Sequence, residues 1–322
     1  MTSFHTLADR LPDLQDLLAA RKRISRWAHV TPVATCEGID LMSGARLFFK
    51  CENLQKVGAF KFRGASNVVL SLRDDEASRG VATHSSGNHA GALALAARLR
   101  GIEAHVVMPS NSSAPKMAAV RGYGAKIIEC EPTLDSREET LDSVVERTGA
   151  IFVHPYDNYG IIAGQATAAM ELLDQVSDLD AIITPVGGGG LLAGTALAVN
   201  YVLPETRVIA GEPQGADDAY RSLREGRIFP SVDPQTIADG LLTSLGERNF
   251  SIIQENVERI ITVGESEIVH AMRVVWERMK MIIEPSSAVA LAVVLENPEL
   301  FSEQRVGIII SGGNVDLDRL PW

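Results

Sequence analysis

A run of four glycines, Gly187 to Gly190, follows the apolar stretch Ala181 to Val186 and leads into Leu191. A β-branched stretch that breaks into glycines and continues in a helical pattern predicts a strand, a tight turn and a helix N-terminus. Glycine lets the backbone approach a ligand closely, and the first amides of the helix have no partner within it. Because no Lys or Arg lies between residues 181 and 206, we expect a phosphate to be held here by amides and the helix dipole alone.

A lysine that could act as a nucleophile lies far upstream, at Lys61 between Phe60 and Phe62. Apolar neighbours desolvate an ammonium group and lower its pKa, which leaves a usable amine. Such a lysine can form a Schiff base with an aldehyde cofactor. A lysine between two aromatic residues is more often a surface residue whose stem covers apolar neighbours, so its role depends on the setting.

Two further strand ends carry polar side chains. The stretch from Ser85 to His89 follows an apolar run and places four polar side chains at a predicted helix N-terminus, where a simple N-cap needs only one. Ser311, followed by two glycines and Asn314, comes directly after the run Val306 to Ile310. Open α/β sheets bind ligands at the carboxyl ends of their strands, and this is where both stretches are expected to lie.

Acidic residues cluster between Glu212 and Asp218. Two carboxylates and a backbone carbonyl in one loop can coordinate a hard divalent cation, with water completing the shell. The alternative is a solvated acidic loop without a ligand.

These motifs must be positioned by an α/β fold, because short apolar runs alternate with helix-length segments through most of the chain. Continuous apolar runs such as Ile308 to Ile310 predict parallel strands that are buried on both faces. A polar, turn-rich break from His154 to Gly160 suggests a domain boundary near Asn158.

Composition excludes several classes of protein. The 322 residues contain 30 Lys and Arg against 41 Asp and Glu, a formal charge of −11, which argues against a nucleic-acid partner. Three scattered cysteines fit a reducing compartment. Residues Met1 to Arg10 do not have the pattern of a signal peptide, and no apolar stretch approaches the roughly 20 residues that span a bilayer. We expect a soluble cytoplasmic protein without a membrane partner.

Together the motifs resemble the fold type II pyridoxal-phosphate (PLP) enzymes, specifically the serine/threonine dehydratase and serine racemase family. They occur in the family's order and approximate spacing, and the resemblance covers nearly the whole chain. It implies a two-lobed α/β fold similar to the β subunit of tryptophan synthase, with mainly parallel sheets flanked by helices. It also implies a large cofactor-binding domain, residues 1–75 and 156–322, and a small mobile domain, residues 76–155.

The resemblance assigns a role to each motif. It implies that Lys61 forms the Schiff base with PLP and that Ser86 is the acid or base on the opposite face of the ring. The substrate carboxylate would bind at Ser85, Ser86, Asn88 and His89. Ser311 would face the pyridine nitrogen, where a serine does not force protonation as a carboxylate would. The residues expected to bind the cofactor are Phe60, Lys61, Asn88, Gly187, Gly188, Gly189, Gly190, Leu191, Glu284 and Ser311.

The racemase branch of the family suggests an identity for the acidic loop. Glu212, Asp218 and the carbonyl of Ala216 would match a Mg²⁺ or Ca²⁺ site there. Members of the family are usually homodimers, and we expect the same of this chain.

The resulting prediction is β-elimination, a dehydration and deamination that converts a small β-hydroxy amino acid to a 2-oxo or imino acid and ammonia. Serine, threonine and 3-hydroxyaspartate are the candidate substrates. The second carboxylate of 3-hydroxyaspartate would need a cationic or amide-rich partner, for which His154 and the residues around Tyr156 are candidates, although a histidine at a strand end is more often structural. Serine racemase activity is the main alternative, because protonation of Cα by Ser86 would racemise the substrate.

An alternative outside this class is a non-catalytic dinucleotide-binding module that uses the glycine run alone. Leu192 stands where the third glycine of that motif should be, and Lys61, Ser86 and Ser311 have no role in such a module. Three departures from the family pattern surround the substrate: Ala59 in place of a serine, Gly91 in place of a glutamine, and Tyr156-Asp157 in the loop that lines the site. The substrate is therefore less firmly predicted than the cofactor.

Overall fold

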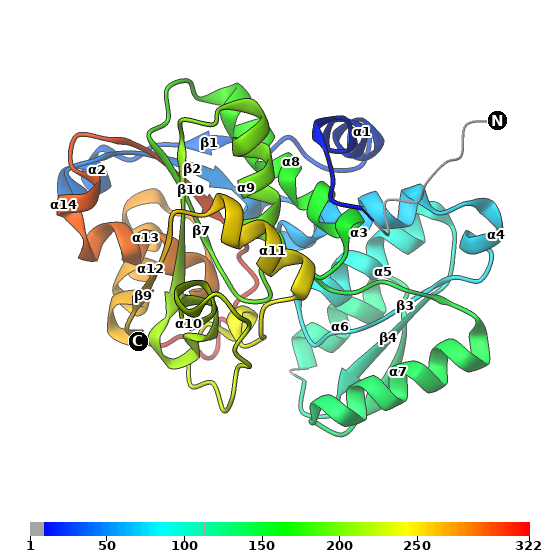
Figure 1. Ribbon diagram of the computed structural model, residues 1–322. Helices are drawn as coiled ribbons and strands as arrows, with labels where there is room; N and C mark the ends of the chain where they lie inside the picture. Colours follow the sequence, from blue (N-terminus) through cyan, green and yellow to red (C-terminus); the bar gives the residue numbers. More distant parts are fainter. Residues whose placement is uncertain (1–9, 113) are drawn as a thin grey trace. The chain divides into compact units, whose positions relative to one another are not determined.

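The computed structural model describes residues 10–112 and 114–322 (Figure 1). Residues 1–9, which make up nearly all of the N-terminal stretch considered above, and Ser113 lie outside the described residues. The chain forms two compact units, each with its own sheet. One unit contains residues up to Ala28 together with Lys61–Gly164, and the other contains His29–Phe60 and Gln165–Trp322. The α/β fold with parallel sheets flanked by helices confirms the predicted fold class.

The larger unit is built on a six-stranded sheet with the order β1-β2-β10-β7-β8-β9. All neighbouring strands are parallel except β1 and β2. Ile308 of β10 pairs with Phe49 of β2 on one side and with Ile183 of β7 on the other. The strands are β1 (Val33–Ala34), β2 (Arg46–Cys51), β7 (Ala181–Pro185), β8 (Arg207–Pro213), β9 (Arg259–Val263) and β10 (Arg305–Ile310).

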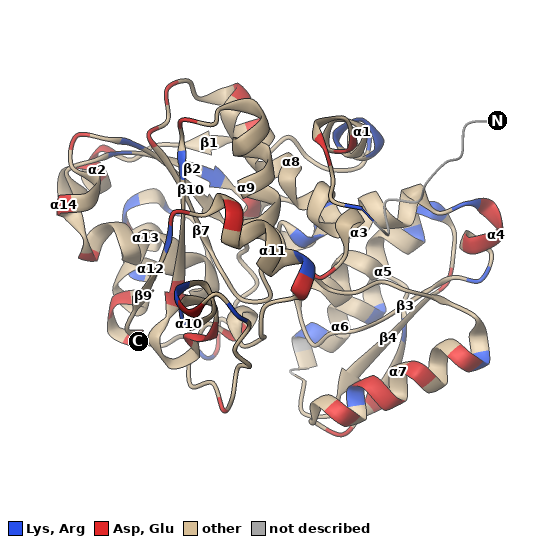
Figure 2. Cartoon of the chain, in the orientation of Figure 1, with Lys and Arg blue, Asp and Glu red and all other residues tan. Residues whose placement is uncertain are grey.

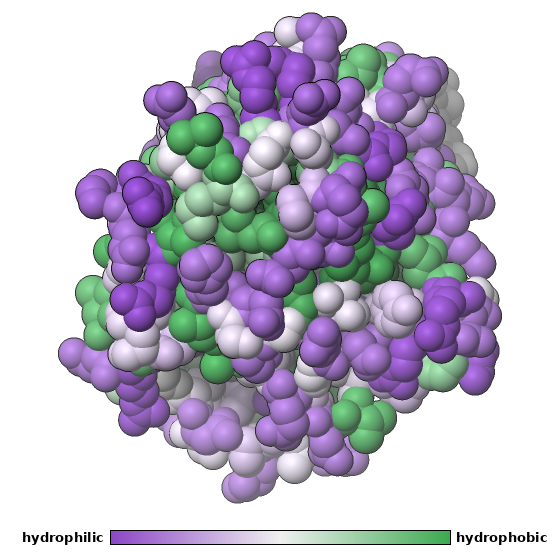
Figure 3. Space-filling model, turned by 90° about the vertical axis from the view of Figure 1, so that its left-hand side faces the viewer, coloured by the Kyte–Doolittle hydropathy of each residue, from purple (hydrophilic) through white to green (hydrophobic). Residues whose placement is uncertain are grey.

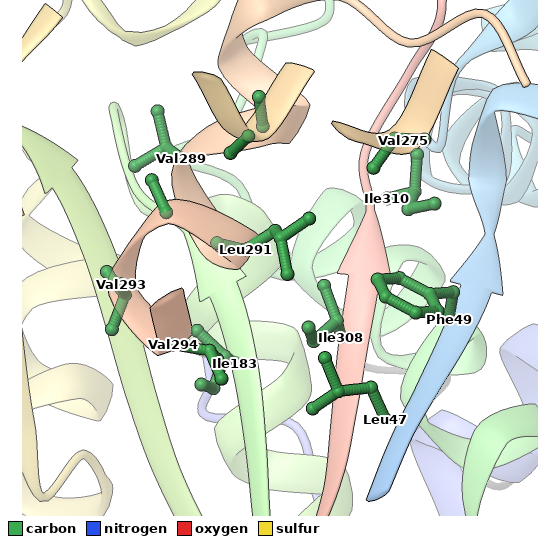
Figure 4. Close-up of a cluster of buried hydrophobic side chains, with 14 of the residues drawn as sticks. Leu47, Phe49, Ile183, Val275, Val289, Leu291, Val293, Val294, Ile308 and Ile310 are labelled. Atoms are coloured by element: carbon green, nitrogen blue, oxygen red, sulfur yellow. The ribbon is translucent and has the colours of Figure 1, made fainter. Parts of the chain in front are cut away.

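Helix α13 (Pro285–Glu296) covers the middle of this sheet. Figure 4 shows Leu291 and Val294 of α13 beside Ile183 of β7 and Ile308 of β10. These side chains are almost fully buried, as expected for parallel strands covered on both faces. The remaining helices of this unit are α2 (Glu37–Ser43), α9 (Gly190–Val202), α10 (Asp218–Glu225), α11 (Glu247–Asn256), α12 (Glu265–Met279) and α14 (Pro298–Phe301), with short 3₁₀ turns at Glu52–Leu54, Lys56–Gly58, Gln214–Ala216 and Asp239–Leu241.

The smaller unit has a four-stranded parallel sheet with the order β5-β4-β3-β6. Its strands are β3 (Val81–His84), β4 (Ala104–Pro109), β5 (Lys126–Cys130) and β6 (Ile151–Phe152), and its helices are α1 (Leu14–Ile24), α3 (Lys61–Ser71), α4 (Asp74–Ala77), α5 (Asn88–Arg100), α6 (Ala114–Gly122) and α7 (Leu134–Thr148). Helix α8 (Tyr159–Gln175) begins in this unit and ends in the larger one.

The two compact units divide the chain at other places than the expected domains: α1, α3 and residues 156–164, expected in the large domain, lie in the smaller unit. Both helices belong to the smaller unit, because α3 packs against α5 and α1 packs against α3. A close helix contact adds to this packing: a Cβ atom on Gly164 of α8 would lie 2.5 Å from Cα of Gly64 in α3. Only glycine at position 164 permits this approach.

The surface carries charged side chains of both signs. Along α7, Asp and Glu outnumber Lys and Arg (Figure 2). On the face drawn in Figure 3, apolar residues lie among hydrophilic ones. Within the part of the chain that the structure describes, none of the helices combines the length and the apolar composition needed to cross a bilayer.

A buried ion pair connects β2 to α8 inside the larger unit. Nζ of Lys50 donates to Oε2 of Glu171 at 2.7 Å, to the Thr31 carbonyl at 2.8 Å and to Oε1 of Gln175 at 3.0 Å. Lys50 is fully buried and Glu171 nearly so. An ammonium group without water needs these oxygen partners, so the pair makes the position of α8 depend on β2.

We predict that Glu171→Leu lowers the free energy of unfolding by about 3–5 kcal/mol, because the buried Lys50 ammonium then loses this carboxylate. Urea unfolding followed by circular dichroism measures this loss. Adding Lys50→Met to Glu171→Leu should restore most of the stability. Asp75→Ala, which breaks an exposed pair with Arg73, is the control and should have little effect. An equal loss in Glu171→Leu and the control would contradict the prediction.

Candidate active site

The glycine run forms the turn between β7 and α9, as the sequence predicts. Gly189 has a φ of +92°, in the left-handed region that favours glycine. A Cβ atom at Gly189 would lie 2.9 Å from Cβ of Asn249, and one at Gly187 would lie 2.9 Å from Cα of Leu241. The turn therefore has no room for side chains at these two positions. Leu191 lies buried in the first turn of α9.

The peptide between Gly188 and Gly189 has a defined orientation. The carbonyl of Gly188 accepts hydrogen bonds from Nδ2 of Asn249 at 2.6 Å and from the Gly246 amide at 3.2 Å. In a trans peptide the N–H points away from the carbonyl, so these bonds direct the Gly189 amide to the opposite side. The N-cap of α9 is Gly189, which has no side chain to occupy the first amides of the helix. The turn thus keeps amides available for an anion, without a cationic side chain.

The second strand end, at β10, is joined to the segment that precedes Lys61. The Phe60 amide donates to the Ser311 carbonyl at 3.0 Å, and Ala59 forms an antiparallel bridge with Gly312. The Gly313 amide donates to the Gly58 carbonyl at 2.9 Å. These bonds fix the backbone up to Phe60, the residue immediately before the candidate nucleophile.

Val57 has an unusual backbone conformation within this segment. Its φ is +58°, which is strained for a β-branched residue. Nδ2 of Asn314 donates to the Val57 carbonyl at 2.7 Å, and the Asn314 amide donates to Oε2 of Glu284 at 3.1 Å. Strain of this kind persists only where the surroundings hold it, and Glu284 supports the hydrogen bonds that do so.

Lys61 is the first residue of α3. Its Nζ donates to the Pro155 carbonyl at 2.9 Å and lies 5.9 Å from the centre of the Tyr156 ring. Burial lowers the pKa of His89 well below its usual value, and the nearby charge of Lys61 lowers it further. Lys61, His89 and the 155–156 turn therefore lie close together in the smaller unit, and His89 is neutral.

The polar stretch Ser85 to His89 forms the turn between β3 and α5. Gly87 is the N-cap of α5, so no side chain at that position occupies the helix amides. Ser85, Ser86 and Asn88 are half-buried, and Asn88 begins the helix. An uncapped helix N-terminus lined with hydroxyl groups can bind a carboxylate.

His154 organises the neighbouring turn. Its Nδ1 accepts hydrogen bonds from the amides of Asp157 at 2.8 Å and Tyr156 at 3.3 Å. An accepting Nδ1 carries no proton, so the proton of the neutral ring is on Nε2. Its ring meets that of Tyr156 edge-on, with 4.6 Å between centroids. The main role of His154 in this geometry is structural.

The predicted metal ligands lie at the end of β8. Glu212 accepts hydrogen bonds from the amides of Ala219 at 2.8 Å and Tyr220 at 2.7 Å, and burial raises its pKa to about 9. Burial also raises the pKa of Asp218 to about 6, although the nearby Ser231 hydroxyl lowers it. Neither carboxylate oxygen of Asp218 has a hydrogen bond of ordinary geometry within residues 10–112 and 114–322. Ala216 ends the 3₁₀ turn between these two carboxylates.

A divalent cation would fit this donor set, because it would supply the positive charge that two buried carboxylates need. Asp217 is not part of the set, because it pairs with Arg221 at 2.8 Å. In the described part of the chain, no cluster of three or more His, Cys, Asp or Glu residues is arranged as a metal site. The candidate site therefore depends on the Ala216 carbonyl and on water for its remaining ligands.

The comparison with known proteins identifies the family. A family model for pyridoxal-phosphate dependent enzymes matches residues 24–312. The chain belongs to the pyridoxal-phosphate-dependent enzymes. It is 51% identical to a β-hydroxyaspartate dehydratase of Paracoccus denitrificans over 312 residues, which cover 97% of this chain and 99% of that protein. It is 50% identical to the serine racemase of Dictyostelium discoideum over 311 residues, covering 95% and 96% of the two chains.

Solved structures agree with this result. The crystal structure of the Dictyostelium discoideum serine racemase aligns with a TM-score of 0.91 and covers 95% of this chain and 99% of its own. The crystal structure of a threonine deaminase from T.th. has a TM-score of 0.91 at 44% identity, with the same coverage. The relatives include dehydratases, deaminases and racemases, which confirms the predicted enzyme class and supports both the elimination and the racemase interpretations. The dinucleotide-binding alternative is wrong.

The residues present fit the cofactor of this family. No capping side chain bonds to the first amides of α9 at the glycine turn, Lys61 offers an amine, and Ser311 offers a buried hydroxyl at a strand end. Sequence reasoning missed three supporting groups: Asn249, the Pro155 carbonyl and Ser287. Each acts on a residue distant in the chain, and no local motif marks any of them.

We predict that Asn249→Ala weakens the affinity for PLP about tenfold, because the Gly188 carbonyl loses one of the hydrogen bonds that orient the turn. Fluorescence titration of the protein stripped of PLP measures the affinity. Asn256→Ala, on the same helix, is the matched control, because its side chain also donates to a backbone carbonyl, that of Ile252, at 2.9 Å. Unchanged affinity in Asn249→Ala, with its folding verified by circular dichroism, would argue against the orienting role.

Proposed function

We propose that this chain catalyses the PLP-dependent β-elimination of a small β-hydroxy amino acid, which yields a 2-oxo or imino acid and ammonia. The observation that carries the proposal is the setting of Lys61, whose amine donates to the Pro155 carbonyl directly after a backbone segment fixed by β10. When bound, PLP accepts the electron pair that remains at Cα of the substrate once the Cα proton has left.

The chain's own residues bind and orient the reactants. The amides of Gly187 to Gly190 hold the cofactor phosphate, and Asn88 donates to the ring hydroxyl. The substrate carboxylate binds at the uncapped α5 N-terminus, among the groups of Ser85 to His89. This arrangement places both anions on helix N-termini rather than on cationic side chains.

Proton transfer then falls to two residues. Nζ of Lys61 would remove the proton from Cα and pass it to the β-hydroxyl group, which would then leave as water. Ser86 lies on the turn that binds the substrate carboxylate, and its hydroxyl can return a proton to Cα from the other face. Return of that proton gives racemisation, which makes racemase activity the second candidate function.

The substrate is proposed to be 3-hydroxyaspartate, serine or threonine. The similarity to a β-hydroxyaspartate dehydratase supports the first of these, and the similarity to a serine racemase supports the second. Nε2 of His154, which carries the ring proton, is a candidate donor to a second carboxylate. The expected homodimer and cytoplasmic location stay predictions.

We predict that Lys61→Ala lowers the rate of product formation by at least about 10²–10⁴-fold, the usual value of a positioned acid or base. The assay incubates the protein with serine, threonine and both diastereomers of 3-hydroxyaspartate, and it measures 2-oxo acid and the chirality of the remaining amino acid. Lys126→Ala, which breaks an exposed pair with Glu103, is the control. Turnover retained in Lys61→Ala would overturn the proposal, and the chirality readout separates elimination from racemisation.

We further propose that Mg²⁺ or Ca²⁺ binds at Glu212, the Ala216 carbonyl and Asp218. Either ion should raise the melting temperature by several degrees over that measured with a chelator, because it binds the folded state alone. Asp218→Asn should abolish this difference. Asp217→Asn changes a neighbouring carboxylate that pairs with Arg221, so it should keep the difference. A melting temperature that is insensitive to both ions would contradict the site.

A further inference from the structure

Residues 153–157 form a turn that is anchored to β3 and α5 of the smaller unit. The Val153 amide donates to the Ala82 carbonyl at 2.8 Å, and the Val153 carbonyl accepts Oγ1 of Thr83 at 2.9 Å. Nε2 of His89 lies 3.4 Å from the same carbonyl oxygen. Val153, Thr83 and His89 are at most 2% exposed. Buried groups on two elements therefore fix the start of the turn.

His154 orients the peptide between Pro155 and Tyr156. This peptide is trans, so its N–H and its carbonyl point in opposite directions. The Tyr156 amide donates to Nδ1 of His154 at 3.3 Å, and the Asp157 amide donates to the same atom at 2.8 Å. The Pro155 carbonyl is consequently directed away from the imidazole ring. Nζ of Lys61 donates to this carbonyl at 2.9 Å, so the imidazole and the amine lie on opposite sides of one peptide.

The aromatic ring beside the amine is held by the same histidine. Nζ of Lys61 lies 5.9 Å from the centre of the Tyr156 ring, and the His154 ring meets that ring edge-on, with 4.6 Å between centroids. Pro155 adds rigidity, because its ring fixes φ at about −65° and it has no amide hydrogen that could form a competing bond. The end of a long, flexible side chain therefore lies against a rigid turn, whose placement depends on His154.

We propose that His154 is a positioning residue for the amine of Lys61, which it places through the Pro155 carbonyl and the Tyr156 ring. The inference rests on the proposed function, in which this amine removes the proton from Cα. An amine with one N–H committed to a fixed acceptor is restricted to few positions, and proton transfer is fast only where donor and acceptor are already aligned. The role uses Nδ1 and the edge of the ring, so it is separate from the candidate contact between Nε2 and a second carboxylate.

Two substitutions separate the acceptor from the bulk of the side chain. Asparagine accepts the amide two residues further along the chain through its side-chain oxygen, so His154→Asn should keep the orientation of the peptide. His154→Leu fills the space without an acceptor and should lose that orientation. Both variants lack Nε2, so a lost contact between Nε2 and the substrate would affect them alike.

The first measurement is chemical labelling of the full chain without PLP. Acetic anhydride acetylates lysines, and mass spectrometry of the peptides compares Lys61 with the exposed Lys126 in the same sample. Because the amine must leave the Pro155 carbonyl before it reacts, Lys61 should be labelled about three- to tenfold faster in His154→Leu, the value of about one hydrogen bond. His154→Asn should label Lys61 at the wild-type rate.

The second measurement uses the holoenzyme and, among the substrates of the assay above, the one that the wild type converts fastest. His154→Leu should lower kcat by about 10- to 10²-fold, because a small misplacement of a reacting group has an effect of this size. The isotope effect of a substrate deuterated at Cα should be at least as large as in the wild type, because removal of that proton is the step that slows. His154→Asn should recover most of the kcat that His154→Leu loses.

His105→Leu is the matched control. His105 is a buried histidine of the same unit, on β4, and it pairs with Glu103 at 3.6 Å. This variant should keep the wild-type labelling and kcat. Equal labelling of Lys61 in the wild type and a folded His154→Leu, or equal kcat in the two His154 variants, would overturn the inference. Faster labelling of Lys61 in His154→Asn would do the same, whether or not His154→Leu folds. The proposed function fails separately, if Lys61→Ala keeps turnover.

Discussion

The hydrogen bonds between the end of β10 and the segment before Lys61 are the constraint on which the candidate site depends. β10 lies in the interior of the six-stranded sheet, between β2 and β7, and its residues are buried from Val306 onward. Because the Phe60 amide and the Gly58 carbonyl are bonded to residues 311–313, the backbone up to Phe60 is held at the end of a buried strand. The amine of Lys61 lies at the end of a long, flexible side chain, but the backbone immediately before this residue is fixed.

The candidate site also offers backbone amides, rather than cationic side chains, to bind anions. The glycine turn after β7 and the turn after β3 both lead into helices whose N-caps are glycines. Neither turn contains a Lys or Arg. Dipoles held in place by the fold need no reorganisation when an anion binds, and they add no further cation that could disturb the amine of Lys61.

The parts of the site that are marked by a local sequence pattern could be predicted from the sequence. The glycine turn and the Ser85–His89 turn are marked by residue types at strand ends, and the structure has both on the expected strand-to-helix turns. Lys61 is marked instead by its apolar neighbours, and it begins α3 after two short 3₁₀ turns. Asn249 and Ser287 were missed because each acts on a backbone group more than twenty residues away. The assignment of α1 and α3 to the smaller unit could not be predicted from the sequence either. It depends on which helix packs against α3, and helical periodicity does not specify a packing partner. His154 shows the structural use that is common for a histidine at a strand end, since its ring accepts backbone amides.

The contact between Gly164 and Gly64 limits the substitutions that this enzyme can tolerate. Gly164 lies one hundred residues from Gly64 in the chain, yet it sets how closely α8 approaches the helix that carries Lys61. A single methyl group there would displace α3 and the amine with it. Among natural or engineered variants, an alanine at position 164 therefore counts as a change in catalytic geometry, although the residue itself contributes no functional group. Surveys of tolerated substitutions that consider only side chains near the amine would overlook it.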